Sequence, residues 1–271
     1  MHNTMLFFTA KGRCYWLKVY ELPEGAKNAK GRAIQNMLNI EPDDALNACL
    51  HIRKPGDADF CQSPYVIFCT KQGVIKKTLL ADYSRPRANG VNAINIREDD
   101  RVVSVALTNG SDEIVIANRN GRAIRFNEDT VRPMGRTATG VRGIRLREGD
   151  YVVGAARAQA GKQVLSITEN GFGKKTPVEE YRITNRGGLG IKNYMVTEKT
   201  GGVVGVKVVD GSEDLLLVTR AGILIRTPVA DIRTTGRATQ GVIVMRFKTE
   251  GDRVISMALA DPEEQTAAAE E

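Results

Sequence analysis

Lysine and arginine recur at constant distances from five glycines along this chain, and basic side chains at regular spacing suggest a site for a polyanion. The glycines are Gly12, Gly73, Gly121, Gly171 and Gly222. A cation follows four of them after four residues, and arginines follow the last three after eleven and fifteen residues. These cations are Lys77, Arg125, Lys175 and Arg226; Arg132, Arg182 and Arg233; and Arg136, Arg186 and Arg237. Guanidinium and ammonium groups form charge-assisted hydrogen bonds with phosphate oxygens.

The constant spacing favours a binding role over a general surface role for these cations. A single lysine on an exposed strand usually only prevents edge-to-edge pairing. Side chains alternate between the two faces of a strand, so a cation at one offset returns to the same face in every unit. We therefore expect a charged track along the rim of a repeated structure, and contacts mainly to phosphate, because no recognition helix for base edges is apparent.

The predicted DNA contacts include the repeated cations and their basic neighbours in each unit. In the first unit Trp16 replaces the cation four residues after the glycine, and Lys27 occupies the fifteenth position. The full set is Arg13, Lys18, Lys27, Lys76, Lys77, Arg85, Arg87, Arg122, Arg125, Arg132, Arg136, Lys174, Lys175, Arg182, Arg186, Arg226, Arg233 and Arg237.

The overall charge agrees with an anionic partner. The chain of 271 residues has a formal net charge of +7, although its last eleven residues hold five acids and no lysine or arginine. Residues 1–260 alone carry +12. Such a body attracts nucleic acid or anionic membrane, and the lack of a basic amphipathic helix disfavours the membrane. No apolar run approaches the roughly 20 residues that span a bilayer, and the first residues do not resemble a secretory signal, so we expect a cytoplasmic protein.

Other kinds of chemistry have little support in the sequence. Two histidines and no nucleophile–base arrangement give no basis for catalysis, so no catalytic residue is expected. The four cysteines, Cys14, Cys49, Cys61 and Cys69, lack metal-ligand spacing and are interpreted as reduced thiols. Residues 171–176 contain glycines and lysines but not the spacing of a phosphate-binding loop. No metal or cofactor is therefore expected in this chain.

The elements that carry the cations are predicted to be strands. Each unit opens with a short apolar strand, turns at its glycine, and continues through a second strand, a basic loop, a third strand, an acidic turn and a fourth strand. Glycine supplies the positive φ that such hairpin turns need, and Asn120-Gly121 and Asn170-Gly171 are the strongest form of the signal. About four strands in each of five units predict an all-β, propeller-like fold.

We expect one domain over residues 1–260 with repeats at about 6–52, 66–107, 114–157, 164–209 and 215–260. We expect residues near 53–64 to form an inserted loop and residues 261–271 to form a disordered acidic tail. Two interpretations of this tail remain open: it competes with DNA for the basic surface, or it only aids solubility.

Several segments closely resemble the C-terminal domain of the bacterial DNA gyrase A protein. They are residues 13–23, 139–146, 170–176 and 236–243, and the similarity extends from about Leu6 to Ala260. The resemblance implies a β-pinwheel, a disc of blades that exchange hairpins and wrap duplex DNA around a basic rim. It further implies a non-catalytic module of an ATP-dependent type II topoisomerase that introduces negative supercoils. Its partners would be double-stranded DNA, the N-terminal breakage-reunion part of the same polypeptide, which holds the catalytic tyrosine, and the gyrase B protein, which uses ATP and Mg²⁺.

Two features depart from this family pattern. Six blades are usual, whereas five units are present here, so a sixth would precede Met1. That blade normally carries the gyrase box QRRGGKG, of which residues 186–190 are only a partial echo. The corresponding domain of topoisomerase IV, which supports decatenation, is an alternative, and a protein-binding scaffold propeller is a second. The arginine-rich loops and the low aromatic content, 6%, favour DNA over a protein partner.

Overall fold

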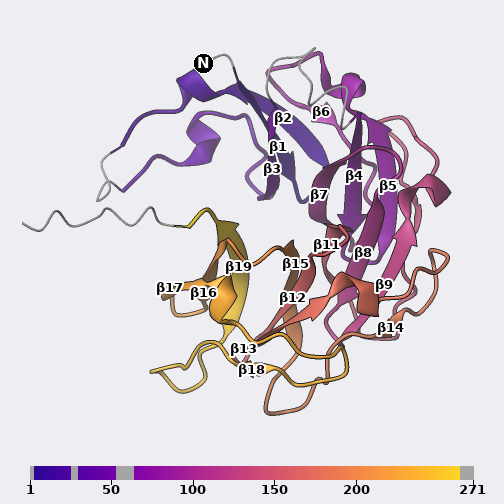
Figure 1. Cartoon of the computed structure of the whole chain (residues 1–271). Coiled ribbons are helices and arrows are strands. Elements are labelled where there is room, and N and C mark those ends of the chain that lie inside the picture. Colours follow the sequence, from indigo (N-terminus) through magenta and orange to yellow (C-terminus); the bar gives the residue numbers. More distant parts are fainter. Residues whose placement is uncertain (1–2, 26–29, 53–63, 263–271) are drawn as a thin grey trace, which may run out of the picture.

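The computed structural model describes residues 3–25, 30–52 and 64–262. Within them, five antiparallel sheets are arranged as blades around a common centre (Figure 1). The helical elements of the described residues are short 3₁₀ turns, and none is long or apolar enough to cross a bilayer. The all-β, propeller-like prediction is therefore confirmed.

Among the described residues, repeats two to five supply four strands each in the same order, whereas the first repeat supplies three. The first repeat contains β1 (Thr4–Thr9), β2 (Arg13–Lys18) and β3 (Leu46–Ile52). The second contains β4 (Tyr65–Thr70), β5 (Val74–Leu79), β6 (Val91–Asn92) and β7 (Val102–Thr108). The third contains β8 (Glu113–Asn118), β9 (Arg122–Asn127), β10 (Val141–Arg142) and β11 (Val152–Ala158).

The last two repeats follow the same pattern. They contain β12 (Gln163–Thr168), β13 (Phe172–Pro177), β14 (Ile191–Lys192) and β15 (Val203–Val209), then β16 (Asp214–Thr219), β17 (Leu224–Pro228), β18 (Val242–Ile243) and β19 (Val254–Ala260). The 3₁₀ turns are η1 (Val19–Glu21), η2 (Ile34–Asn36), η3 (Leu80–Tyr83), η4 (Glu128–Thr130), η5 (Val178–Glu180) and η6 (Val229–Asp231). Five of these turns, all except η2, begin directly after the second strand of a repeat.

Neighbouring blades share strands, because the short third strand of a repeat pairs with the preceding blade. The sheets have the orders β3-β1-β2-β6, β7-β4-β5-β10, β11-β8-β9-β14 and β15-β12-β13-β18, whereas the fifth has only β17-β16-β19. The third strand expected in each unit is limited in the third repeat to Val141–Arg142, which pairs with Ile75 and Val74 of β5. Each repeat therefore adds the outermost strand to the blade before it.

Apolar side chains on both faces of the blades form the core between them. Ile67, Cys69 and Ile75 of the second blade pack against Ile114 and Ile116 of the third, and similar clusters join the other neighbours. Burial of this apolar surface is the main stabilising contribution to such a fold. Because each cluster takes residues from two blades, each blade depends on its neighbours.

The glycine turns are tightly covered except in the fifth repeat. All five glycines have φ between 79° and 83°, the left-handed conformation expected from the sequence. A Cβ on Gly121 would lie 2.5 Å from the carbonyl oxygen of Tyr194, which follows the strand β14 received from the next repeat. A Cβ on Gly222 would meet nothing within 4 Å among the described residues. The turn of the last blade thus lacks the cover that a following repeat provides elsewhere.

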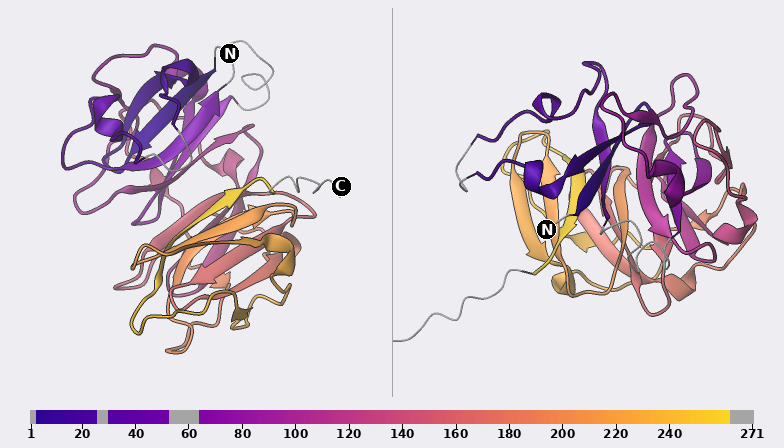
Figure 2. Two further views of the ribbon diagram at one scale, coloured as in Figure 1. Left: turned by 90° about the vertical axis from the view of Figure 1, so that its left-hand side faces the viewer. Right: turned by 90° about the horizontal axis from the view of Figure 1, so that it is seen from above.

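The blades form an open arc. The inner strands β3, β7, β11, β15 and β19 pack in this order, and within the described parts of the chain β19 does not make a comparable contact with β3. Figure 1 shows the first and fifth blades on either side of the open side, and the left view of Figure 2 looks at that side, with the first blade above the fifth. Leu38 and Ile40 cover the face of the first blade that carries Phe7, Tyr15 and Leu17.

Candidate nucleic-acid interface

The rim of the arc is built by loops that cross from one blade to the one before. We call residues 132–140, 182–190 and 233–241 the rim loops. Pro133 bridges in parallel to Lys77 of β5, Ile183 to Arg125 of β9, and Thr234 to Lys175 of β13. Each rim loop therefore runs along the outer strand of the preceding blade, beside the exchanged strand.

Three arginines at the start of the rim loops face solvent. Arg132, Arg182 and Arg233 are exposed and lie directly before the bridging residues. Among the described residues none of the three side chains forms a hydrogen bond or ion pair. Their guanidinium groups are therefore available to an external anion. The three arginines lie on successive blades.

The arginines fifteen residues after the glycines are anchored more firmly. Arg186 donates from Nη1 to the carbonyl of Arg142 at 3.1 Å and from Nε to that of Thr130 at 3.1 Å. Arg237 donates from Nη1 to the carbonyl of Lys192 at 2.7 Å. Arg136, half-buried, makes no side-chain hydrogen bond within the described part of the chain. Arg186 and Arg237 thereby tie a rim loop to the exchanged strand of the neighbouring repeat.

Three of the four cations that lie four residues after the glycines, Lys77, Arg125 and Lys175, bind the next repeat instead of facing outward. Lys77 donates from Nζ to the carbonyl of Glu128 at 2.9 Å and lies 3.7 Å from its carboxylate, with both side chains at most 4% exposed. Arg125 pairs with Glu113 and donates to the carbonyls of Val178 and Tyr181 at 2.9 and 3.0 Å.

Lys175 makes a similar contact with the next repeat, whereas Arg226 pairs within its own repeat. Lys175 is 6% exposed and donates to the carbonyl of Ala230 at 3.4 Å, and Arg226 pairs with Asp214 at 2.7 Å. Trp16, which replaces the cation in the first repeat, donates from its indole Nε1 to the carbonyl of Tyr83 at 2.8 Å. These five side chains share one face, as expected. We call Trp16, Lys77, Arg125 and Lys175, which reach the 3₁₀ turn of the next repeat, the interblade contacts.

Two further lysines expected at the rim lie in the interior. Lys76 and Lys174 are 0% exposed, and their ammonium groups donate to backbone carbonyls. The expectation that Lys76, Lys77, Lys174 and Lys175 contact phosphate is therefore corrected, because a buried and hydrogen-bonded ammonium group cannot reach a duplex. Arg125 and Arg226 are also removed from the predicted DNA contacts, because the carboxylates of Glu113 and Asp214 compensate their charges.

The other predicted residues vary in exposure. Arg85 and Arg87 are exposed and lie between η3 and β6. Arg13 donates to the carbonyl of Asn89 at 2.6 Å, and Arg122 donates to those of Leu189 and Gly190 at 3.0 and 2.7 Å. Both therefore hold the turn before an exchanged strand. Lys27 lies outside the described residues, as does the acidic tail from residue 263 onward.

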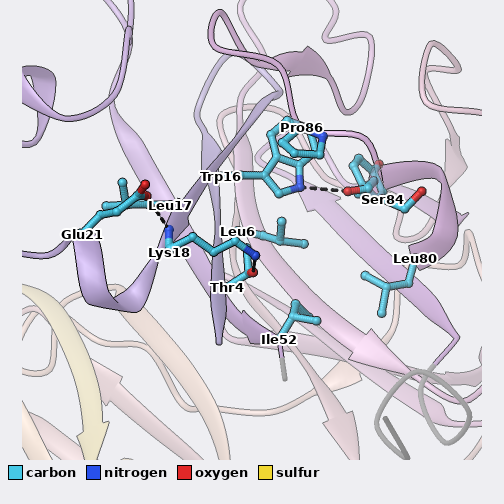
Figure 3. A pocket seen from close by; sticks show the side chains of 11 residues that line it. Thr4, Leu6, Trp16, Leu17, Lys18, Glu21, Ile52, Leu80, Ser84 and Pro86 are labelled. Carbon is cyan, nitrogen blue, oxygen red and sulfur yellow. Dashed lines mark hydrogen bonds between the residues drawn. The ribbon is translucent and has the colours of Figure 1, made fainter. Parts of the chain in front are cut away.

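Lys18 belongs to an apolar hollow near the first blade and not to the rim loops. Figure 3 shows its ammonium group directed at the Thr4 hydroxyl, 2.8 Å away. The hollow has a volume of about 260 Å³ and is lined by Leu6, Trp16, Ile52 and Leu80, among others. Its lining is mainly apolar, so it does not extend the basic surface.

Further exposed basic residues outside the set predicted from the sequence lie beside the rim loops. Arg142 and Lys192 lie on the exchanged strands β10 and β14 and are exposed. Arg97 and Arg145 join Arg142 around a polar hollow of about 490 Å³ beside the turn of Gly73. Arg142 and Lys192 lie at the same distance after Gly121 and Gly171, and Arg97 and Arg145 lie at the same distance after Gly73 and Gly121, so their spacing is a usable sequence signal.

The described residues contain no cluster of metal ligands, and two of their three cysteines are buried. In the ranges 3–25, 30–52 and 64–262, no group of three or more His, Cys, Asp or Glu side chains could hold a metal ion. Cys14 and Cys69 are buried free thiols, and burial raises the pKa of Cys69 to about 12. Thiols in such surroundings remain protonated and unreactive at neutral pH.

Comparison with known proteins agrees with this architecture. The family model described as "DNA gyrase C-terminal domain, beta-propeller" matches residues 3–53, 64–109, 112–159, 162–210 and 213–261. The DNA gyrase A protein of Clostridium acetobutylicum is 49% identical over 257 residues, which are 95% of this chain and 30% of the relative. The DNA gyrase A protein of Salmonella typhimurium is 41% identical over 261 residues, 96% of this chain and 29% of the relative.

Solved structures show the same fold. The C-terminal domain of a DNA topoisomerase IV has a TM-score of 0.84 and 29% identity, with 96% of this chain and 80% of that chain covered. A DNA gyrase A C-terminal domain has a TM-score of 0.80 and 23% identity, with coverage of 95% and 82%. The chain thus spans about 30% of the length of the curated relatives it matches. With five consecutive matches along nearly its whole length, the chain belongs to the family of DNA gyrase C-terminal domains.

Proposed function

We propose that this chain is a non-catalytic module that binds duplex DNA and bends it around the rim of the arc. The observation that carries the proposal is the row of exposed guanidinium groups, Arg132, Arg182 and Arg233, one on each successive rim loop. Arg142 and Lys192 on the exchanged strands add charge to the same edge. A curved row of cations can offset the bending energy of a duplex, which is of order 1–6 kcal/mol for a smooth bend of 40–90°.

The whole protein is proposed to be the gyrase A component of a DNA gyrase. Its breakage-reunion part, the gyrase B protein, ATP and Mg²⁺ would supply the reaction, while this module orients the wrapped duplex for strand passage. The relatives support this assignment by name, and we expect the protein to act in the cytoplasm, where the chromosome lies. No residue of this module is proposed to touch the reacting phosphodiester.

A topological assay tests the proposal. A nicked plasmid is incubated with increasing amounts of the chain, sealed with DNA ligase, and freed of protein before electrophoresis. Wrapping of a consistent hand shifts the linking number of the products in one direction. Binding without such a shift would exclude wrapping, and affinity that does not change between 50 and 200 mM salt would contradict a phosphate-binding rim, because each neutralised phosphate releases counterions.

Topoisomerase IV remains a second candidate for the whole protein because its C-terminal domain has the same fold. The two candidates differ in the reaction of the full enzyme. A gyrase introduces negative supercoils into relaxed plasmid with ATP, whereas topoisomerase IV would only relax and decatenate. The 49% and 41% identities to gyrase A proteins favour the first.

A further inference from the structure

Two buried lysines lie directly beneath rim loops and bind their backbone. Lys76 of β5 donates from Nζ to the carbonyl of Arg136 at 2.7 Å and to that of Ala93 at 2.6 Å. Lys174 of β13 donates to the carbonyl of Gly236 at 2.7 Å and also to that of Arg237. Both lysines therefore hold the backbone at the arginine that lies fifteen residues after a repeat glycine.

The rim loop of Arg186 lacks this support. The residue of β9 that corresponds to Lys76 and Lys174 is Ile124, an apolar core residue. Arg186 is held instead by its own guanidinium group, which donates to the carbonyls of Thr130 and Arg142. The lysine support is therefore a property of two particular blades and not of the repeat.

The surroundings of Lys76 favour loss of its proton near neutral pH. Desolvation lowers the pKa of Lys76 to about 7; the charge of Asp82 raises it and that of Arg136 lowers it. The ring of Phe68 lies 5.6 Å from Nζ. The nearby Tyr83 hydroxyl shares the Ala93 carbonyl and has a pKa raised by burial, so it remains neutral.

Lys174 has nearly the same environment. Desolvation lowers its pKa to about 7, the charge of Glu180 raises it and that of Arg237 lowers it. The ring of Tyr194 lies 5.3 Å from Nζ. Burial raises the pKa values of Tyr181 and Tyr194, so these neighbours also stay neutral between pH 6 and 9.

We propose that Lys76 and Lys174 are positioning residues for DNA binding, whose charged side chains fix the rim loops of Arg136 and Arg237. This inference rests on the proposed function. Charge-assisted hydrogen bonds are roughly twice as strong as neutral ones, so the loops are held less firmly when the lysines lose their protons. A bound duplex favours the charged lysines through its negative field. DNA binding therefore takes up protons, and the affinity falls as the pH rises.

Stability should respond to pH with the opposite sign. Between about pH 7 and the ordinary lysine pKa of 10.5, the unfolded chain keeps protons that the folded chain has lost. The free energy of unfolding therefore increases with pH through this range. A purely structural role for the lysines predicts this stability change but no loss of DNA affinity.

The experiment measures DNA affinity at constant salt from pH 6 to 9 for the wild-type chain and for a Lys76→Met, Lys174→Met double variant. Each increase of one unit in a lysine pKa on binding corresponds to about a tenfold change in affinity over this range. We expect the wild-type affinity to fall by at least that factor, and the double variant to bind weakly with a flat pH profile. A double variant that keeps the wild-type profile would overturn the inference.

Lys207→Met is a control for the loss of a lysine away from the rim loops' hydrogen bonds. Lys207 lies exposed on the inner strand β15 and has no hydrogen bond to a rim loop within the described residues. This variant should keep the wild-type pH profile. If it loses the profile, the effect depends on lysine charge in general and not on support of the rim loops.

A measurement on the wild-type chain covers the case in which the double variant does not fold. NMR titration of the lysine Cε resonances should show two lysines with midpoints near pH 7 that shift upward when DNA is added. Unchanged midpoints on DNA addition would contradict the inference while leaving the proposed function intact. Absence of DNA binding at every pH would contradict the proposed function itself, and the inference with it.

Discussion

The basic side chains of this molecule serve two different purposes, and their position in the repeat decides which. The side chains of Arg132, Arg182 and Arg233 are exposed to solvent. The ammonium groups of Lys77 and Lys175 instead donate hydrogen bonds to carbonyl oxygens of the next repeat. A buried ammonium group without partners would be very costly, and these contacts offset that cost. Repeated charge in a sequence can therefore indicate a binding surface or an internal contact.

Replacement of Arg132, Arg182 and Arg233 by alanine should weaken DNA binding without loss of stability. Each lost phosphate contact reduces the magnitude of the slope of log K against log salt by about 0.9. The slope for the triple variant should therefore be smaller than the wild-type slope by up to about 2.7. The free energy of unfolding should change by less than about 0.5 kcal/mol per site, because the side chains are exposed. Salt titrations of binding and urea unfolding measure the two quantities.

Lys162→Ala is the control for this triple variant. Lys162 is a surface lysine between β11 and β12 that pairs with Asp210 at 3.5 Å and forms no hydrogen bond with a rim loop among the described residues. Its removal should leave the salt slope almost unchanged. An equal loss of slope would mean that binding depends on total charge and not on the rim.

At the scale of elements, the blades of the structure do not coincide with the repeats of the sequence. The exchanged strands β6, β10, β14 and β18 leave their own repeats and complete the preceding blades. The interblade contacts join the same neighbouring repeats, because each runs from the second strand of one repeat to the 3₁₀ turn of the following repeat. Neighbouring blades are thus joined by backbone pairing, apolar clusters and buried polar contacts.

Lys77→Met should destabilise the fold by about 3–5 kcal/mol, the usual cost of removing one partner from a buried ion pair. The Glu128 carboxylate would remain buried. It would still accept hydrogen bonds from the Thr108 hydroxyl and from the backbone N–H groups of Gly110 and Asp112, which carry no charge. Urea unfolding of the variant measures the loss. Glu128→Gln in the Lys77→Met background should recover part of the stability, and no recovery would show that the charge of Glu128 is not the cause.

The whole molecule is an arc with two different ends, and equal positions in the repeat therefore have unequal environments. Ile75 and Leu224 both lie two residues after a repeat glycine. Ile75 is fully buried because β10 and the third blade cover it, whereas Leu224 of the three-stranded fifth blade is 59% exposed.

Ile75→Ala should therefore destabilise the chain by about 2–5 kcal/mol, and Leu224→Ala by less than about 1 kcal/mol. Both variants remove apolar side-chain atoms at the same position of the repeat, so each serves as the control for the other. Denaturant unfolding measures both. Similar losses would indicate that the fifth blade is covered in solution, for example by a second copy of the chain.

The sequence by itself determined the strand–turn–strand units, because Gly121 and its equivalents require positive φ and because apolar residues alternate with turn signals. It also determined the family, through residues such as 139–146 and 170–176. Both are local patterns that a linear chain contains completely.

The tertiary structure alone decided which cations face solvent. Lys76 and Arg132 look equally suitable in the sequence, but Lys76 points into the space between a blade and a rim loop that comes from another repeat. The pairing of β10 with β5 was equally hidden, since two-residue strands carry almost no local signal. Exposure and strand exchange depend on what neighbouring repeats place beside a residue, and the spacing of one repeat does not contain that information.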